Sequence, residues 1–62
     1  MYYAIQVIGY GKKQRFVIQH VIPGRGTNPT DGKKYATLED AKTAAAAAGY
    51  HIEKTGDYWE II

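Results

Sequence analysis

The strongest candidate for chemistry in this sequence is a group of cationic side chains beside a tyrosine. Lys12, Lys13 and Arg15 fall within four positions of one another, and only Gly11 separates them from Tyr10. Lysine and arginine neutralise phosphates or form a charged rim around a protein contact, and a neighbouring aromatic ring offers a face for stacking. We therefore predict that this segment takes part in binding.

Side chains for covalent or metal chemistry are scarce. The sequence has no serine and no cysteine, so it offers neither a Ser–His or Cys–His nucleophile nor a thiolate metal site. Two histidines, His20 and His51, cannot close a structural zinc site alone. The Gly-Arg-Gly at residues 24–26 lacks the Gly-Lys-Thr ending of a phosphate-binding loop. We expect a protein that is not an enzyme and that uses no cofactor and no metal.

Two strands are expected to position the cationic residues. Residues 2–10 and 15–22 alternate in hydrophobicity and are rich in strand-forming residues. Gly9 and Gly11 between them tolerate the positive φ of a tight connection, so an antiparallel hairpin is predicted. The first strand is largely apolar on both faces, which is typical of a central strand.

A loop and a helix should follow the hairpin. Residues 23–34 contain many turn formers and almost no apolar side chain, which predicts a flexible loop. Thr37 is a good N-cap with Asp40 at the N3 position, and Gly49 supplies the left-handed residue that ends a helix. An alanine-rich helix is therefore expected from Thr37 to Gly49. Its inward stripe should be Leu38, Ala41, Ala44 or Ala45, and Ala48.

The chain after the helix has the pattern of a second hairpin, in which residues 50–55 and 58–62 flank a Gly-Asp turn of the two-residue type II′ form. The predicted fold is one α+β domain covering residues 1–62, in ββαββ order. Its sheet would have four antiparallel strands, with the helix packed on one face. Such a helix spans about 16 Å and cannot cover four strands spaced about 4.8 Å apart. We therefore expect the other face of the sheet to stay open.

Aromatic side chains make that open face a second candidate for binding. The chain carries six tyrosines and one tryptophan, and these residue types are enriched at interface hot spots. Trp59 has two interpretations, the centre of the core or part of an interface. The predicted partner-binding residues are Tyr2, Tyr10, Tyr58, Trp59, Lys12, Lys13 and Arg15.

Size and composition suggest the setting in which the domain works. A chain of 62 residues rarely gains more than about 3–5 kcal/mol from its core, and this one has no disulfide, so we expect a homodimer. No apolar run approaches the roughly 20 residues of a membrane span, and no segment has the pattern of a signal peptide. The absence of cysteine is typical of a reducing compartment, and we expect a cytoplasmic protein.

Two stretches of the chain resemble the sporulation-related repeat, a small peptidoglycan-binding domain. They are Tyr3-Ala4-Ile5-Gln6-Val7 and Tyr35-Ala36-Thr37-Leu38-Glu39-Asp40-Ala41-Lys42. That family has two helices in βαββαβ order, whereas this chain predicts a hairpin in place of the first helix. We therefore assign no family from the sequence.

Two functions follow from these observations. The net charge of +2 is small for a dedicated nucleic-acid binder, so our leading hypothesis is a non-enzymatic domain that acts through protein–protein contact. Many proteins of phages and mobile elements have this size and regulate or inhibit a host protein by occupying its surface. The alternative is a nucleic-acid-binding protein that uses the basic hairpin Lys12, Lys13 and Arg15 with the neighbouring tyrosines.

Overall fold

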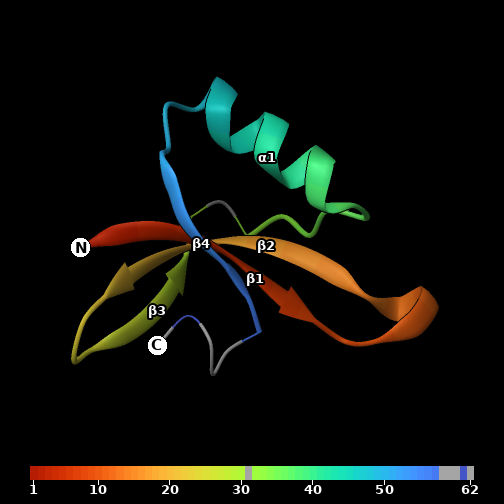
Figure 1. The fold of residues 1–62 in the computed structure, drawn as a ribbon, viewed down its shortest axis with the longest axis horizontal. Helices are drawn as coiled ribbons and strands as arrows, with labels where there is room; N and C mark the ends of the chain where they lie inside the picture. Colours follow the sequence, from red (N-terminus) through yellow and green to blue (C-terminus); the bar gives the residue numbers. More distant parts are fainter. Residues whose placement is uncertain (31, 58–60, 62) are drawn as a thin grey trace.

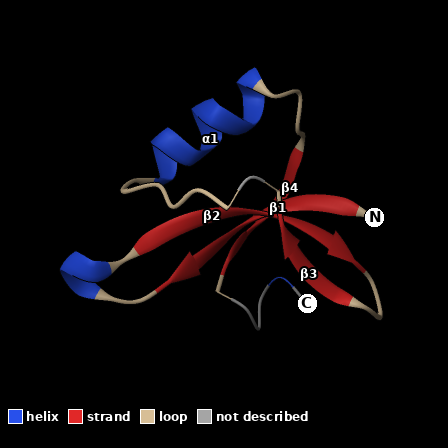
Figure 2. Cartoon of the chain, turned by 180° about the vertical axis from the view of Figure 1, so that it is seen from behind, coloured by secondary structure: helices blue, strands red, loops and turns tan. Residues whose placement is uncertain are grey.

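The protein, seen in a computed structural model that describes residues 1–30, 32–57 and 61, contains a mixed four-stranded sheet crossed by one helix (Figures 1 and 2). In chain order the elements are β1 (Tyr2–Ile8), the 3-10 helix η1 (Gly11–Lys13), β2 (Arg15–Ile22), β3 (Gly26–Pro29), α1 (Leu38–Ala47) and β4 (Ile52–Gly56). Across the sheet the strand order is β3-β2-β1-β4. The predicted α+β class is confirmed.

β1 and β2 form the antiparallel hairpin that the alternating pattern predicts. Their register runs from Tyr2 opposite Val21 to Ile8 opposite Arg15. β1 has β2 on one side and β4 on the other, so it is an inner strand, as its two apolar faces indicate.

β4 departs from the predicted antiparallel arrangement because it pairs with β1 in parallel, with Ile52 opposite Tyr3. The expected hairpin between residues 50–55 and 58–62 was inferred from the local turn pattern; of its second strand only Ile61 is described. β3 runs in the same direction as β1, because each pairs antiparallel with β2. The segment containing α1 returns the chain from the end of β3 to the start of β4, so β4 also runs parallel to β1. The sheet is therefore mixed, so the predicted all-antiparallel sheet is wrong, and the ββαββ order is matched only in part.

β3 lies inside the segment that the sequence predicts to be a loop. It pairs antiparallel with the end of β2, from Gln19 opposite Pro29 to Ile22 opposite Gly26. An edge strand needs little apolar content, and its outer side tolerates proline, so the turn formers of this segment hid the strand. Farther along, Tyr35 exchanges two backbone hydrogen bonds of 2.8 Å with Phe16.

The helix has the ends that the sequence predicts. Thr37 is the N-cap, and its hydroxyl accepts a hydrogen bond of 3.1 Å from the Asp40 N–H. At the other end Gly49 has φ +83°, the Gly49 N–H donates to the Ala46 carbonyl at 3.1 Å, and the Tyr50 N–H donates to the Ala45 carbonyl at 2.8 Å. These two bonds form a Schellman motif. In the described part of the chain, no helix is both long and apolar enough to cross a membrane.

The predicted inward stripe of α1 is only partly correct. Ala41 and Ala45 are fully buried, and Leu38 and Ala44 are half-buried. Ala48 is exposed, because it is the C-cap residue, where the chain leaves the helix. Two buried methyl groups let α1 lie close against the sheet, over β1 and β2 (Figure 1).

The face of the sheet away from α1 is not open along its whole length. Ala4 and Ile5 are neighbours in β1 and point to opposite faces, yet neither has any exposed surface. On the side of Ala4, the fully buried side chain of Ile61 packs with Ala4 and Val21. The Tyr2 hydroxyl donates a hydrogen bond to the Ile61 carbonyl. The expectation of an uncovered face is therefore corrected, because Ile61 covers part of it.

Shortening Ile61 should test this second layer. Ile61→Ala is expected to lower the free energy of unfolding by about 2–5 kcal/mol, since it leaves a cavity against Ala4 and Val21. Urea unfolding followed by circular dichroism measures the loss. Met1→Ala is the control, since the Met1 side chain is 82% exposed and its removal should change stability by less than about 0.5 kcal/mol. Equal stability of the two variants would contradict the proposed packing.

Candidate functional site

The predicted binding residues do not form one continuous surface. Tyr2 begins β1, whereas Tyr10 lies beyond its end, so the two side chains are about 20 Å or more apart along the strand. The cationic residues lie beside Tyr10. Tyr58 and Trp59 lie outside the described residues. The structure therefore divides the predicted surface into a hairpin tip (residues 10–15) and a separate region around Tyr2.

The hairpin tip is shaped by backbone hydrogen bonds and two glycines. The Lys13 N–H donates to the Tyr10 carbonyl, and the Gln14 N–H donates to the Gly11 carbonyl, each at 3.2 Å. These bonds form the 3-10 turn of η1, which reverses the chain between β1 and β2. Gly9 and Gly11 have φ of +72° and +62°, where only glycine avoids a steric penalty. The tip therefore has a defined backbone.

Arg15 contributes to the structure of the tip as well as to its charge. Its Nη1 atom donates to the Gln14 carbonyl at 2.7 Å and to the Lys12 carbonyl at 3.3 Å. Both bonds are exposed to solvent, so each adds little stability. They hold the guanidinium against the turn, which keeps its positive charge close to Lys12.

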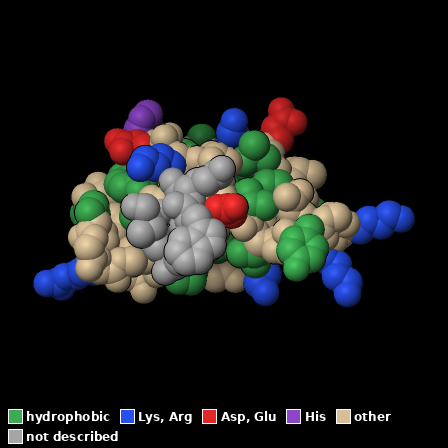
Figure 3. Space-filling view, turned by 60° about the horizontal axis from the view of Figure 1, so that its bottom comes forward, with side chains coloured by type: hydrophobic (Ala, Val, Ile, Leu, Met, Phe, Trp, Pro, Cys, Tyr) green, Lys and Arg blue, Asp and Glu red, His purple; other side chains and the backbone are tan. Residues whose placement is uncertain are grey.

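The remaining side chains of the tip are presented to solvent. Tyr10 is 90% exposed, and Lys12 and Lys13 are exposed as well. The tip stands at one end of the molecule, at the turn of the β1–β2 hairpin (Figures 1 and 2). In the space-filling view, Lys and Arg side chains project at both ends, with hydrophobic side chains between them (Figure 3). A ring with almost no intramolecular contact is available for a partner.

A broad hollow adjoins the tip. Its volume is about 490 Å³, and it is lined by Gln6, Val7, Ile8, Gly9, Tyr10, Gln14 and Asp57. Gln6 accepts a hydrogen bond of 2.6 Å from the Nε2 atom of Gln19, a residue that is only 7% exposed. The floor of the hollow is thus fixed by a partly buried polar contact, and its rim carries the exposed ring of Tyr10.

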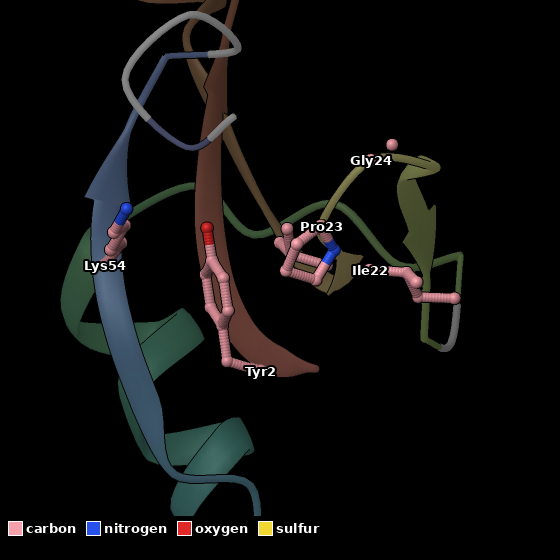
Figure 4. Close-up of a pocket in the computed structure, with 7 residues that line it drawn as sticks. Tyr2, Ile22, Pro23, Gly24 and Lys54 are labelled. Atoms are coloured by element: carbon pink, nitrogen blue, oxygen red, sulfur yellow. The ribbon is translucent and has the colours of Figure 1, made fainter.

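Tyr2 lies in a different environment, beside a lysine that the sequence did not single out for binding. The Nζ atom of Lys54 is 5.4 Å from the centroid of the Tyr2 ring, within the range of a cation–π interaction. Figure 4 shows Tyr2 between Lys54 and Pro23, with these side chains on the side of the sheet away from α1. Only the parallel register of β4, which sets Lys54 opposite Ala4, brings this lysine to Tyr2, so no local pattern could reveal it.

His20 is part of a column of aromatic side chains. The His20 ring stacks on Tyr3 with centroids 5.3 Å apart, and Tyr3 stacks on Tyr50 at 4.4 Å. This aromatic column joins β2, β1 and the end of the helix. Within the described ranges, no three His, Asp or Glu side chains are grouped so as to hold a metal ion.

Comparison with known proteins assigns no family. No protein-family model, curated protein or solved structure matches the chain. The candidate function therefore rests on the geometry of the hairpin tip and of the region around Tyr2.

Replacing the two glycines of the tip separates backbone strain from steric clash. A Cβ atom at Gly9 would lie 2.8 Å from the Lys13 carbonyl oxygen, whereas a Cβ at Gly11 would meet no atom within 4 Å. In both variants the positive φ lowers the free energy of unfolding by about 1 kcal/mol, because alanine is strained in that conformation. In Gly9→Ala the backbone at Lys13 must also move away from the new Cβ atom. We expect Gly9→Ala to lower the thermal unfolding midpoint by several degrees more than Gly11→Ala. Equal midpoints in differential scanning calorimetry would contradict the described tip.

Proposed function

We propose that this protein is a small non-enzymatic binding domain that regulates or inhibits another protein by contact through its hairpin tip. The observation that carries the proposal is the exposure of Tyr10, 90%, at a tip that also presents Lys12 and Lys13. The exposed ring of Tyr10 makes almost no contact that would stabilise the domain itself. Its burial against a partner would be favourable, because it removes aromatic surface from water.

The two kinds of side chain have different parts in the proposed contact. Tyr10 supplies buried area and therefore most of the affinity, because interface energy concentrates in aromatic anchors. Lys12 and Lys13 stay at the rim and accelerate association with an acidic surface. The hairpin projects from the body of the domain, so its tip fits a concave site on the partner, and occupying that site is how it would regulate or inhibit.

Capture from a native lysate with matched variants tests this proposal. Tyr10→Ala should reduce recovery of a specific partner at least tenfold, and Lys12→Glu with Lys13→Glu should slow its association, while Lys42→Glu on the exposed side of α1 should change neither. Partners are identified by mass spectrometry after nuclease treatment. If every partner binds Tyr10→Ala as well as wild type, the tip is not the contact surface.

The same tip supports nucleic-acid binding as a second candidate function. An exposed ring beside two lysines and Arg15 is the arrangement that stacks a base while the cations neutralise neighbouring phosphates. Because Lys12 and Lys13 lie on the single turn of η1, they could contact only a short stretch of a nucleic-acid strand.

Salt dependence distinguishes this candidate from a protein contact. For single-stranded oligonucleotides, the affinity should fall with salt with a log–log slope of about −0.7 for each phosphate contacted. Lys12→Gln should make the slope shallower by about 0.7, whereas Lys42→Gln should leave it unchanged. Fluorescence anisotropy measures both slopes, and the absence of any binding at low salt would exclude nucleic acid.

A further inference from the structure

A second hollow lies at the opposite end of β1 from the hairpin tip. Its volume is about 210 Å³, and it is lined by Tyr2, Val21, Ile22, Pro23, Gly24, Gly26 and Lys54. These residues come from all four strands and from the turn that joins β2 to β3. Its lining is apolar side chain and glycine backbone except for the Tyr2 hydroxyl and Lys54. None of the described residues that line it is acidic.

Lys54 gives this hollow a single positive charge. It is exposed, so its ammonium remains hydrated, and in the described part of the chain it lies over the ring of Tyr2 without a carboxylate partner. Arg25 follows Gly24 in the adjoining turn and is also exposed. The hollow is therefore complementary in charge to an anion that carries an apolar group.

The walls of the hollow are fixed before any ligand enters. The Tyr2 hydroxyl donates to the Ile61 carbonyl, which sets the orientation of the ring. Pro23 has a rigid backbone, and the Arg25 N–H closes the turn through a hydrogen bond of 2.9 Å to the Ile22 carbonyl. A preformed site loses little conformational entropy on binding, which favours a small ligand.

We propose that this hollow binds the C-terminal residue of another protein, with its apolar side chain in the hollow and its carboxylate at Lys54. A volume of about 210 Å³ is below the roughly 300–1,000 Å³ of small-molecule sites and suits one side chain. The charge of Lys54 selects the carboxylate.

The position of the charge favours a chain end over an internal acidic residue. Lys54 and Tyr2 line the same hollow, and the Lys54 Nζ atom is only 5.4 Å from the centroid of the Tyr2 ring (Figure 4). A C-terminal residue carries its side chain and its carboxylate on the same Cα atom and can reach both. In an extended chain, an acidic residue next to an apolar one points to the opposite side.

This inference is independent of the proposed role of the hairpin tip. The hollow lies at the start of β1, and the tip lies beyond its end. Lys54→Gln leaves Tyr10, Lys12 and Lys13 unchanged, so the failure of one proposal is distinguishable from the failure of the other.

Nuclear magnetic resonance titration of the ¹⁵N-labelled protein tests the site. The probe is an N-acetylated tripeptide, alanine-alanine-phenylalanine, with a free C-terminal carboxylate. Its addition should shift the backbone amide signals of Tyr2, Gly24, Gly26 and Lys54 at millimolar concentration. The same peptide with a C-terminal amide should bind roughly twofold to fivefold more weakly, because a contact between an exposed lysine and a carboxylate contributes modestly.

Two variants and a third peptide complete the experiment. Lys54→Gln should abolish the preference for the free carboxylate, while Lys42→Gln, which removes another exposed lysine from α1, should preserve it. A capped peptide with an internal phenylalanine-aspartate pair should bind no better than the amide. Absence of shifts at these four amides, equal binding of acid and amide, or stronger binding of the internal aspartate would each overturn the proposal.

Discussion

The structure depends on a central strand that must be covered on both faces. Ala4 and Ile5 are adjacent in β1, point to opposite sides of the sheet and have no exposed surface. A single layer of strands cannot bury both, so the chain places α1 on one side and Ile61 on the other. In a domain this small, each of these layers is a large part of the total stability.

The two layers also decide which surfaces remain for binding. α1 presents only the methyl groups of Ala41 and Ala45 to the sheet, so it lies close and covers β1 and β2. Ile61 covers the part of the opposite face formed by Ala4 and Val21. Two of the predicted binding residues are then at opposite ends of β1, where Tyr10 extends into solvent and Tyr2 borders a hollow.

These two ends have different physical characters. The hairpin tip carries an aromatic ring with almost no intramolecular contact, on a backbone held by the 3-10 turn and by Arg15. The ring of Tyr2 is held by its hydroxyl and by Lys54, so it forms part of a preformed wall. An exposed anchor suits insertion into a concave partner, whereas a rigid hollow suits a single inserted side chain.

The sequence by itself determined the elements whose signals are local. The first hairpin follows from alternation and glycine, and the helix from Thr37 at its start and Gly49 at its end. The direction of β4, the strand at Gly26–Pro29 and the cover supplied by Ile61 depended on the tertiary structure. Two strands that are distant in the sequence pair according to which sheet edges and apolar faces the rest of the chain leaves uncovered. A short segment of sequence does not contain this information. For the same reason the cations beside Tyr10 were visible in the sequence, whereas the pairing of Lys54 with Tyr2 was not.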